Sequence, residues 1–349
     1  MQKQISKNNS ELDSSELNAS EKIMSMVFGF MVSQAISVIA RLGIAELLQE
    51  GSRSAADLAE ATHSHPHSLY RVMRALASKG IFHEHEDKTF SLTPMGNLLK
   101  KNPLDGIGGF SAFFCSDWHW PVWGSLDYSV RTGKPAFEKV YNQPFFSYLE
   151  ECPRASQIFN EGMTSFSAAT GAAVLDAYDY SGIKRLIDVG GGHGYLLASI
   201  VKRYPEITGI LFDAPSVING AQPILNACNA DTQFELVGGD FFEKIDAKGD
   251  AIIMKHVLHD WDEESCLKIL HNCHTALPKN GKLLVVEMVI PGPNQPAIGK
   301  WLDLQMLLML HSHERTEEEY STLFAKAGFR LTRIFPSMSP FSIIEAVRM

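Results

Sequence analysis

The sequence predicts an α/β fold in which a doubly wound sheet follows a smaller winged-helix domain. From Lys184 onward, short apolar strand-like runs alternate with helical segments, which is the pattern of a doubly wound sheet. One of these runs leads into a glycine-rich turn at 190–194 and then into a helix. Upstream, the segment from Ser52 to Leu92 has the helix and strand order of a winged helix.

The composition fits a soluble protein with two domains. The chain has 349 residues and 45% of them are hydrophobic, which is enough for more than one core. The formal net charge of −9 gives no overall attraction to phosphate backbones or anionic membrane surfaces, so nucleic acid and membrane partners are disfavoured. The five cysteines are scattered and odd in number, as expected of reduced thiols in a cytoplasmic protein.

The amino-terminal segment divides into a polar leader and an apolar helix. Residues 1–19 hold too little apolar material to pack and are predicted to be disordered, and Ser20 is a suitable helix N-cap. Residues 23–40 carry no charge and have the length of a membrane span, but several polar side chains interrupt them. We therefore predict a helix buried against its own domain and a second subunit, as in a homodimer.

The winged-helix domain is predicted at 20–102. Two helices that begin near Ser54 and Ser68 are followed by short strands at 81–82 and 89–92. Winged helices commonly bind DNA, but the second helix carries only two arginines and no broader positive patch accompanies them. A role in dimerisation is favoured, and a ligand-sensing transcription regulator is the alternative.

Residues 103–180 are predicted to form a helical connector that is unusually rich in aromatic side chains. Two interpretations stay open, because such rings can be core or can line a pocket for a flat apolar ligand. The aromatic residues of this region are Phe110, Phe113, Phe114, Trp118, Trp120, Trp123, Tyr128, Phe137, Tyr141, Phe145, Phe146 and Tyr148.

Residues 181–349 are predicted to hold a seven-stranded sheet. Its last two strands form a hairpin after a helix at 316–327, which is unlike a dinucleotide-dependent dehydrogenase. The predicted strands are Arg185–Val189, Thr208–Asp213, Phe234–Val237, Ala251–Lys255, Lys282–Val289, Arg330–Phe335 and Phe341–Val347.

Acidic residues follow three consecutive strands and indicate an adenosine cofactor. Asp188 precedes the turn that starts at Gly190, where it can meet a ligand ammonium group. Asp213 ends the next strand, from which a carboxylate can accept hydrogen bonds from ribose hydroxyls. Asp240 can accept from an adenine amino group while Phe241 packs on the ring.

The segment after the fourth strand contains two histidines, His256 and His259, which can be a metal pair, core residues or catalytic groups. A reaction in which a phenol oxygen is the nucleophile needs a base, because a phenol with a pKa near ~10 is mostly protonated at neutral pH. His259 can be that base. Glu287, at the end of the fifth strand, or Glu314 can orient the imidazole, although Glu314 can also be only a helix-capping acid.

These motifs resemble the caffeic acid and hydroxyindole (acetylserotonin) type of small-molecule O-methyltransferase, including bacterial members that modify natural products. The resemblance spans about residues 20–349. It implies a class I methyltransferase fold, a Rossmann-like seven-stranded sheet, with an amino-terminal dimerisation domain. The residues that carry it are 188–194, Phe212-Asp213-Ala214-Pro215, 238–242, Lys255 through Trp261, Val286-Glu287 and Glu314-Arg315-Thr316.

The resemblance also implies site residues and a cofactor, S-adenosylmethionine, without a metal. His259 is the implied proton acceptor, bracketed by Glu287 and Glu314. The implied cofactor contacts are Gly190, Asp213, Asp240, Phe241 and Lys255, and the acceptor pocket includes Phe159, Met163, Asp260 and Met306.

Two departures from the family pattern affect the acceptor. Residues 310–313 read Leu-His-Ser-His where the family has a glycine pair and a basic residue, which predicts a stiffer, more polar loop. Gln305 stands where bacterial relatives often carry Asn. Methylation of nitrogen or carbon, or another S-adenosylmethionine chemistry on the same fold, is therefore the first alternative.

Overall fold

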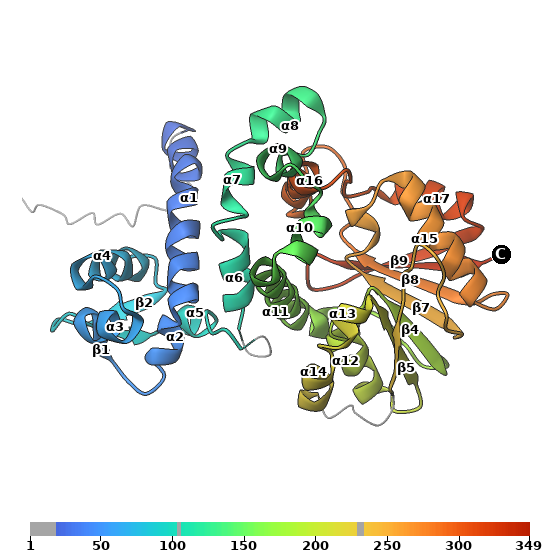
Figure 1. Cartoon of the computed structure of the whole chain (residues 1–349), viewed down its shortest axis with the longest axis horizontal. Coiled ribbons are helices and arrows are strands. Elements are labelled where there is room, and N and C mark those ends of the chain that lie inside the picture. The colour runs from blue at the N-terminus through green and yellow to red at the C-terminus, as the bar shows by residue number, and fades with distance from the viewer. Residues whose placement is uncertain (1–18, 103–105, 229–233) are drawn as a thin grey trace, which may run out of the picture.

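The sheet and the amino-terminal domain lie at opposite ends of the molecule, with the connector helices between them (Figure 1). The structure is a computed structural model that describes residues 19–102, 106–228 and 234–349. All but the last residue of the predicted leader at 1–19 lies outside the described residues. Helix α1 already includes Ala19, so Ser20 lies within the helix instead of capping it.

Seven strands form one sheet in the order β6-β5-β4-β7-β8-β10-β9. The first five pair in parallel, and β10 is antiparallel to both of its neighbours. This confirms the predicted seven-stranded sheet with its final hairpin. The strands are β4 (Arg185–Val189), β5 (Thr208–Asp213), β6 (Phe234–Gly238), β7 (Ala251–Lys255), β8 (Lys282–Glu287), β9 (Phe329–Pro336) and β10 (Ser342–Arg348).

Helices cover both faces of this sheet because neighbouring strand residues point to opposite sides. Ile187 and Ile252 belong to a core shared with α15 and α17, whereas Leu186 and Ile253 belong to a second core shared with α11 and α12. The helices of this domain are α12 (Tyr195–Arg203), α13 (Pro215–Ile218), α14 (Gln222–Ala227), α15 (Glu263–Ala276), α16 (Gly299–Met309) and α17 (Glu317–Lys326).

The amino-terminal domain has the predicted winged-helix elements around a core of its own. The structure adds a two-residue strand, β1, which pairs with β3 and which the sequence did not indicate. The elements are α1 (Ala19–Leu42), α2 (Ile44–Leu47), β1 (Arg53–Ser54), α3 (Ala55–Thr62), α4 (Pro66–Ala77), β2 (Phe82–Glu84), β3 (Thr89–Leu92) and α5 (Pro94–Asn97).

The connector consists of short helices and one long helix, α11, that packs on α6 and α12. Many of its rings are core: Phe113, Trp118, Phe137 and Phe145 are buried in one aromatic cluster. The helices are α6 (Gly108–Phe114), α7 (Trp120–Trp123), α8 (Leu126–Thr132), α9 (Ala136–Tyr141), α10 (Phe145–Glu151) and α11 (Pro153–Ala177).

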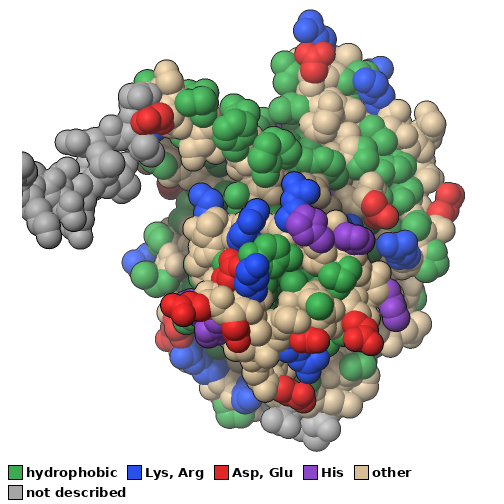
Figure 2. All heavy atoms as spheres, turned by 90° about the vertical axis from the view of Figure 1, so that its left-hand side faces the viewer, with side chains coloured by type: hydrophobic (Ala, Val, Ile, Leu, Met, Phe, Trp, Pro, Cys, Tyr) green, Lys and Arg blue, Asp and Glu red, His purple; other side chains and the backbone are tan. Residues whose placement is uncertain are grey.

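Helix α1 is long and apolar enough to cross a membrane, by length and composition, and it is the one such helix among the described residues. In a single chain it is poorly covered: Met26 is 74% exposed and Phe28 is 53% exposed. Figure 2 shows hydrophobic side chains in a band across the upper part of the face to which α1 belongs. An apolar surface of this kind marks an interaction site.

Candidate active site

The glycine-rich turn lies at the carboxyl edge of the sheet, between β4 and α12, and its backbone requires glycine. Gly190, Gly192 and Gly194 all have positive φ, between 60° and 79°, a region that other residues rarely adopt. A Cβ atom at Gly191 would lie 2.6 Å from Cγ of Asp188. At the glycines of this turn the main chain carries no side chains, so a ligand can approach it closely. The turn follows the carboxyl end of β4, where open α/β sheets bind ligands.

The carboxylate of Asp213 holds this turn from the end of β5. Its Oδ2 accepts a hydrogen bond from the main-chain N–H of Gly192 at 2.7 Å, and its Oδ1 accepts from the N–H of Ala214 at 2.7 Å. Burial raises the pKa of Asp213, while these two hydrogen bonds oppose the shift.

Asp240 and Phe241 follow β6 on the same edge. Asp240 is exposed, and its Oδ1 accepts from the N–H of Phe242 at 2.8 Å. The ring of Phe241 lies close enough to the turn that a Cβ at Gly190 would be 3.8 Å from it. Both residues therefore border the same turn as Asp213.

Asp188 and Lys255 form the buried floor of this region. Neither carboxylate oxygen of Asp188 has a hydrogen-bond partner among the described residues, although the side chain is only 1% exposed. Burial raises the pKa of Asp188 to about 7, with the charge of Asp213 adding to the shift and that of Lys255 opposing it. Burial likewise lowers the pKa of Lys255 to about 7. An unpaired buried carboxylate beside an open glycine turn fits a ligand that carries an ammonium group.

Lys255 also has a hydrogen-bond partner, Ser167, that the sequence did not indicate. Its Nζ donates a hydrogen bond to Oγ of Ser167 at 2.9 Å. Ser167 lies one helical turn after Met163 on α11, so the spacing from a predicted acceptor contact was the available signal.

His259 lies in a short 3-10 turn (Leu258–Asp260) after β7 and is buried. Its Nδ1 donates to Oε1 of Glu314 at 2.8 Å, and its Nε2 lies 3.4 Å from Oδ1 of Asp260. Burial would lower the pKa of His259, but the charges of Glu314 and Asp260 outweigh it and raise the pKa to about 10. Burial also raises the pKa of Asp260, to about 7.

Glu314 does not act as the cap of α17. Thr316 is the N-cap residue of that helix, and it forms a capping box with Glu319. The main-chain N–H of Glu314 donates to Oδ1 of Asp303 on α16 at 2.9 Å. This anchor leaves the Glu314 side chain to hold the imidazole of His259.

Glu287, the first candidate for orienting the imidazole, is bonded instead to the main chain of the turn. Its Oε1 accepts from the N–H groups of Val257, Leu258 and His259 at 3.2, 2.7 and 3.2 Å. Its Oε2 accepts from the hydroxyl of Tyr320 at 2.7 Å. The expectation that Glu287 accepts a hydrogen bond from the imidazole is therefore wrong, and Glu314, the second candidate, accepts it instead.

Ligand-type atoms of His259, Glu287 and Glu314 lie within 4.8 Å of one another, which is compatible with metal spacing. Both oxygens of Glu287 already accept hydrogen bonds, and the Nδ1 of His259 is bonded to Glu314. These donor atoms are thus engaged with one another, with Tyr320 and with the main chain, whereas Oε2 of Glu314 has no hydrogen-bond partner among the described residues. The bond between His259 and Glu314 suits a proton-binding group.

His256 is packed among aromatic rings, and its ring centroid lies 5.1 Å from that of His259. Its ring stacks on Phe166 with centroids 5.6 Å apart and meets Phe341 edge-on at 4.5 Å. Burial, with the charges of Lys255 and His259, lowers the pKa of His256 well below its usual range. Its main chain has φ +57°, which allows the chain to turn sharply after β7.

The predicted acceptor contacts lie among apolar side chains of α11 and α16. Phe159 meets the rings of Phe113 and Phe145 edge-on at 5.5 and 5.4 Å, and Met163 packs on the same cluster. Met306 is buried on α16. Phe159 and Met163 therefore pack against one and the same aromatic cluster.

Gln305 is held in one orientation by the buried His119 and the half-buried Trp123. Its Oε1 accepts from Nε1 of Trp123 at 2.8 Å, and its Nε2 lies 2.7 Å from Nε2 of His119. Since Nδ1 of His119 faces the carbonyl of Phe114 at 2.7 Å, Nδ1 carries the proton and Nε2 accepts from Gln305. Burial lowers the pKa of His119 to about 4, which keeps this ring neutral.

The loop after α16 holds the Leu-His-Ser-His run of residues 310–313. Nε2 of His311 lies 3.3 Å from Oε1 of Glu138 on α9, so the loop contacts the connector.

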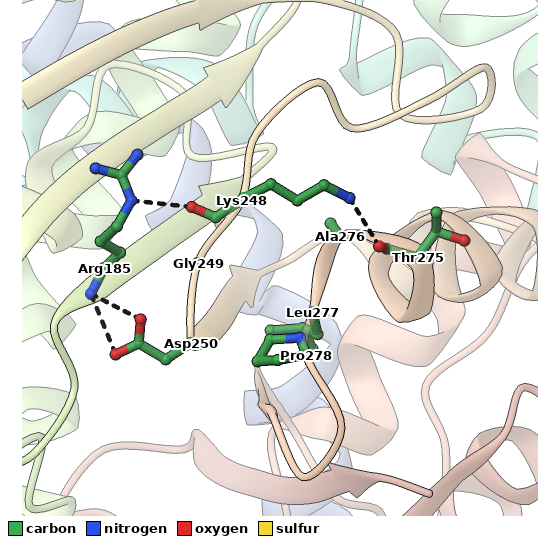
Figure 3. Close-up of a pocket in the computed structure, with 8 residues that line it drawn as sticks. All are labelled: Arg185, Lys248, Gly249, Asp250, Thr275, Ala276, Leu277 and Pro278. Carbon is green, nitrogen blue, oxygen red and sulfur yellow. Dashed lines mark hydrogen bonds between the residues drawn. The ribbon is translucent and has the colours of Figure 1, made fainter.

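A separate pocket of about 390 Å³ opens at the amino ends of β4 and β7, lined by Arg185, Lys248 and Thr275 among others (Figure 3). Its polar groups bond to one another, and it lies at the edge opposite to the glycine turn.

Comparison with known proteins assigns these features to a family. An O-methyltransferase domain matches residues 123–330, and an O-methyltransferase dimerisation domain matches residues 24–102. The chain belongs to the O-methyltransferase family. Its sheet and winged-helix domain are therefore the class I methyltransferase fold and the dimerisation domain that the sequence motifs implied.

The similarity to known proteins extends over nearly the whole of this chain. A phenazine O-methyltransferase of Lysobacter antibioticus is 40% identical over 93% of this chain and 95% of its own length. The solved structure of a mitomycin 7-O-methyltransferase is 35% identical, with a TM-score of 0.86 over 95% of this chain and 98% of that one. An 8-amino-8-demethylriboflavin N,N-dimethyltransferase of Streptomyces davaonensis is 31% identical over 95% of this chain and 96% of its own length.

The cofactor of the O-methyltransferase is S-adenosylmethionine. A methyltransferase of calicheamicin biosynthesis, solved with S-adenosylhomocysteine bound, is 28% identical and has a TM-score of 0.81 over 96% of this chain and all of that chain. The unpaired Asp188 carboxylate and the side-chain-free turn fit the ammonium group and the backbone approach of such a ligand.

Proposed function

We propose that the enzyme methylates a hydroxyl oxygen of a small aromatic metabolite and that His259 is the general base. The observation that carries this proposal is the buried hydrogen bond between Nδ1 of His259 and Glu314, located at the cofactor edge of the sheet. This bond leaves Nε2 as the nitrogen that can take the acceptor proton. Asp260, 3.4 Å from Nε2, is placed to touch the same hydroxyl.

In this mechanism the chain supplies a base and a fixed geometry. Bound S-adenosylmethionine supplies an electrophilic methyl group, whose bond to sulfur breaks as the acceptor oxygen attacks. Nε2 of His259 takes the hydroxyl proton, and Glu314 stabilises the imidazolium that results. The buried floor and the aromatic connector exclude water and align the two reactants.

We assign the cofactor contacts by their position on the carboxyl edge. The carboxylate of Asp213 receives the ribose hydroxyls, and Gly190 provides the close main-chain approach. Asp240 and Phe241 receive the adenine, and Lys255 with Ser167 binds the amino-acid end. Each of these groups borders the turn or its buried floor, which supports one continuous cofactor site.

The acceptor site is assigned to Phe159, Met163, Met306 and Asp260. The rings and thioethers favour a flat, apolar acceptor. The phenazine and mitomycin specificities of two relatives support a fused-ring metabolite. Gln305, held by Trp123 and His119, supports a rigid rather than adaptable wall on the α16 side.

The domains are assigned the roles that their positions suggest, in a cytoplasmic homodimer. Residues 20–102 form the dimerisation domain, 103–180 the connector with the acceptor pocket, and 181–349 the cofactor domain. The exposed apolar side chains of α1, within the matched dimerisation domain, support subunit association over insertion into a membrane.

Methylation of nitrogen is the second candidate, because one relative with similar coverage is named an N,N-dimethyltransferase. An amine acceptor that is neutral at the working pH needs no base to expose its lone pair. The buried pair of His259 and Glu314 therefore favours oxygen, where a proton must be removed.

The test is the transfer of labelled methyl from S-adenosylmethionine to hydroxyphenazines, hydroxyquinones, catechols and aminophenols, with mass spectrometry and NMR locating the new methyl. We expect O-methylated products from the wild type and little product from His259→Ala. N-methylated aminophenols with no O-methylated product would replace this proposal by the second candidate.

A further inference from the structure

The turn that carries His259 is held at both ends by charged side chains. On its N–H side, Glu287 accepts from three consecutive main-chain donors. On its carbonyl side, Arg315 donates from Nη1 to the carbonyl of Leu258 at 2.8 Å and from Nη2 to the carbonyl of Trp261 at 3.1 Å. The arginine thus spans His259, because it bonds the residue directly before it and the residue two positions after it.

Arg315 is an unusual buried cation. It is only 3% exposed, and no carboxylate lies within 4.0 Å of its guanidinium among the described residues. Its resolved acceptors are the two carbonyls and, at 3.4 Å, Sγ of Cys266, which itself donates to the carbonyl of Leu258. A buried charge whose hydrogen-bond acceptors all lie on or beside one turn is placed to fix that turn.

The main chain of Arg315 is itself fixed. Its carbonyl accepts from the N–H of Ile290 at 2.9 Å, and it pairs with Val289 in a parallel bridge just after β8. The preceding residue, Glu314, bonds the imidazole of His259 and is anchored on Asp303. Two consecutive residues therefore hold the ring and the main chain of the same histidine.

We propose that Arg315 is a positioning residue that holds the main chain of the His259 turn, so that the imidazole keeps its bond to Glu314 and its aim at the acceptor hydroxyl. This inference rests on the proposed role of His259 as the base. A planar guanidinium can bond two carbonyls at once, which a lysine ammonium on a flexible stem does less well. The arginine is therefore specifically suited to this position.

The experiment compares Arg315→Lys and Arg315→Met with the wild type on two phenols of one ring skeleton. One phenol has an ordinary hydroxyl, and the other is its 2-nitro derivative, which is ionised at the assay pH and needs no base. We expect kcat for the ordinary phenol, corrected for the fraction of neutral His259 at the assay pH, to fall about 10-fold in the lysine variant and about 100-fold in the methionine variant, as for a slightly misplaced catalytic group. For the nitrophenol the fall should be less than about threefold, with the Kd for S-adenosylhomocysteine unchanged.

The matched control is Arg185→Met. Arg185 also donates to a main-chain carbonyl, that of Lys248 at 3.0 Å, but at the opposite edge of the sheet (Figure 3). This variant should keep the wild-type kcat for both phenols. If the methionine variant of Arg315 does not fold, the lysine variant carries the test.

A second readout needs no acceptor: the titration of the His259 ring, followed by NMR with His259→Gln as the assignment reference. Loosening of the turn weakens the bond to Glu314, so the pKa of His259 should fall by about one unit or more in Arg315→Lys. Equal losses on both phenols, no loss on either, or an unmoved ring titration would overturn the inference. Failure of the wild type to methylate any acceptor would instead count against the proposed function.

Discussion

His259 is oriented by a carboxylate that lies 55 positions further along the chain, in the loop between α16 and α17. The sequence offered two glutamates for this task, both expected near the carboxyl edge, and Glu287 was the first candidate because Glu314 could also be a helix-capping acid. The side-chain directions decide between them: Glu287 points along the end of β8 into the main-chain N–H groups, and Glu314 meets the ring. A difference of this kind depends on tertiary packing, which periodicity does not report.

The charge of Glu314 predicts a pH dependence of catalysis. Burial disfavours the charged imidazole, but Glu314 and Asp260 outweigh it and raise the pKa of His259 to about 10. The base must be neutral to accept a proton, so kcat/KM should rise with pH across the neutral range. In Glu314→Gln the pKa of His259 should fall, and the rising limb should move to lower pH by about 1–3 units.

The measurement is kcat/KM against pH for both proteins with the same phenol. The ionisation of the phenol is common to the two profiles, so it cannot produce a difference between them. Superimposable rising limbs would show that Glu314 does not set the pKa of the catalytic base.

At the scale of the elements, the glycine turn gives a steric prediction. A Cβ at Gly191 would lie 2.5 Å from Cδ1 of Leu211 and 2.6 Å from Cγ of Asp188, so Gly191→Ala must displace the floor of the cofactor site. We expect the Kd for S-adenosylhomocysteine, measured by calorimetry, to rise about tenfold or more, the equivalent of ~1.4 kcal/mol.

Gly292→Ala is the control for this change. The nearest atom to its added Cβ would be Nε2 of Gln295 at 3.5 Å, an ordinary contact. It should bind the ligand as the wild type does. Wild-type affinity in Gly191→Ala would contradict the assignment of this turn to the cofactor.

The strands were predictable because each is a short run rich in apolar residues, buried along most of its length in β4, β5, β7 and β8, and all seven appear within about three residues of their expected bounds. Strand β1 was not, since Arg53 and Ser54 carry no apolar signal and pair only because β3 lies beside them. The start of α4 was placed late for a related reason: His65, a less common cap than Ser68, accepts the capping bond. The aromatic connector stayed ambiguous because burial of a ring does not distinguish core from pocket.

At the scale of the whole molecule, α1 predicts the subunit interface. Met24, Phe28 and Met31 are each about half exposed in a single chain, although they belong to the matched dimerisation domain. A charge introduced there would be buried against an apolar partner surface, which is costly. Phe28→Glu should therefore shift the protein from dimer to monomer in sedimentation analysis.

Met338→Glu provides the comparison, because Met338 is 98% exposed and lies between β9 and β10. It should remain dimeric. A Phe28→Glu protein that stays dimeric would place the interface elsewhere.

In the proposed mechanism, His259 removes the acceptor proton during methyl transfer. The most direct test of this step is a single-turnover measurement, in which wild type and His259→Ala are loaded with labelled S-adenosylmethionine and mixed with a saturating phenol acceptor. We predict that the rate of the transfer step falls about 10²–10⁴-fold in the variant, the usual contribution of a general base, while the Kd values for both ligands stay within about twofold. Equal transfer rates in the two proteins would contradict the claim and leave alignment of the reactants as the source of catalysis.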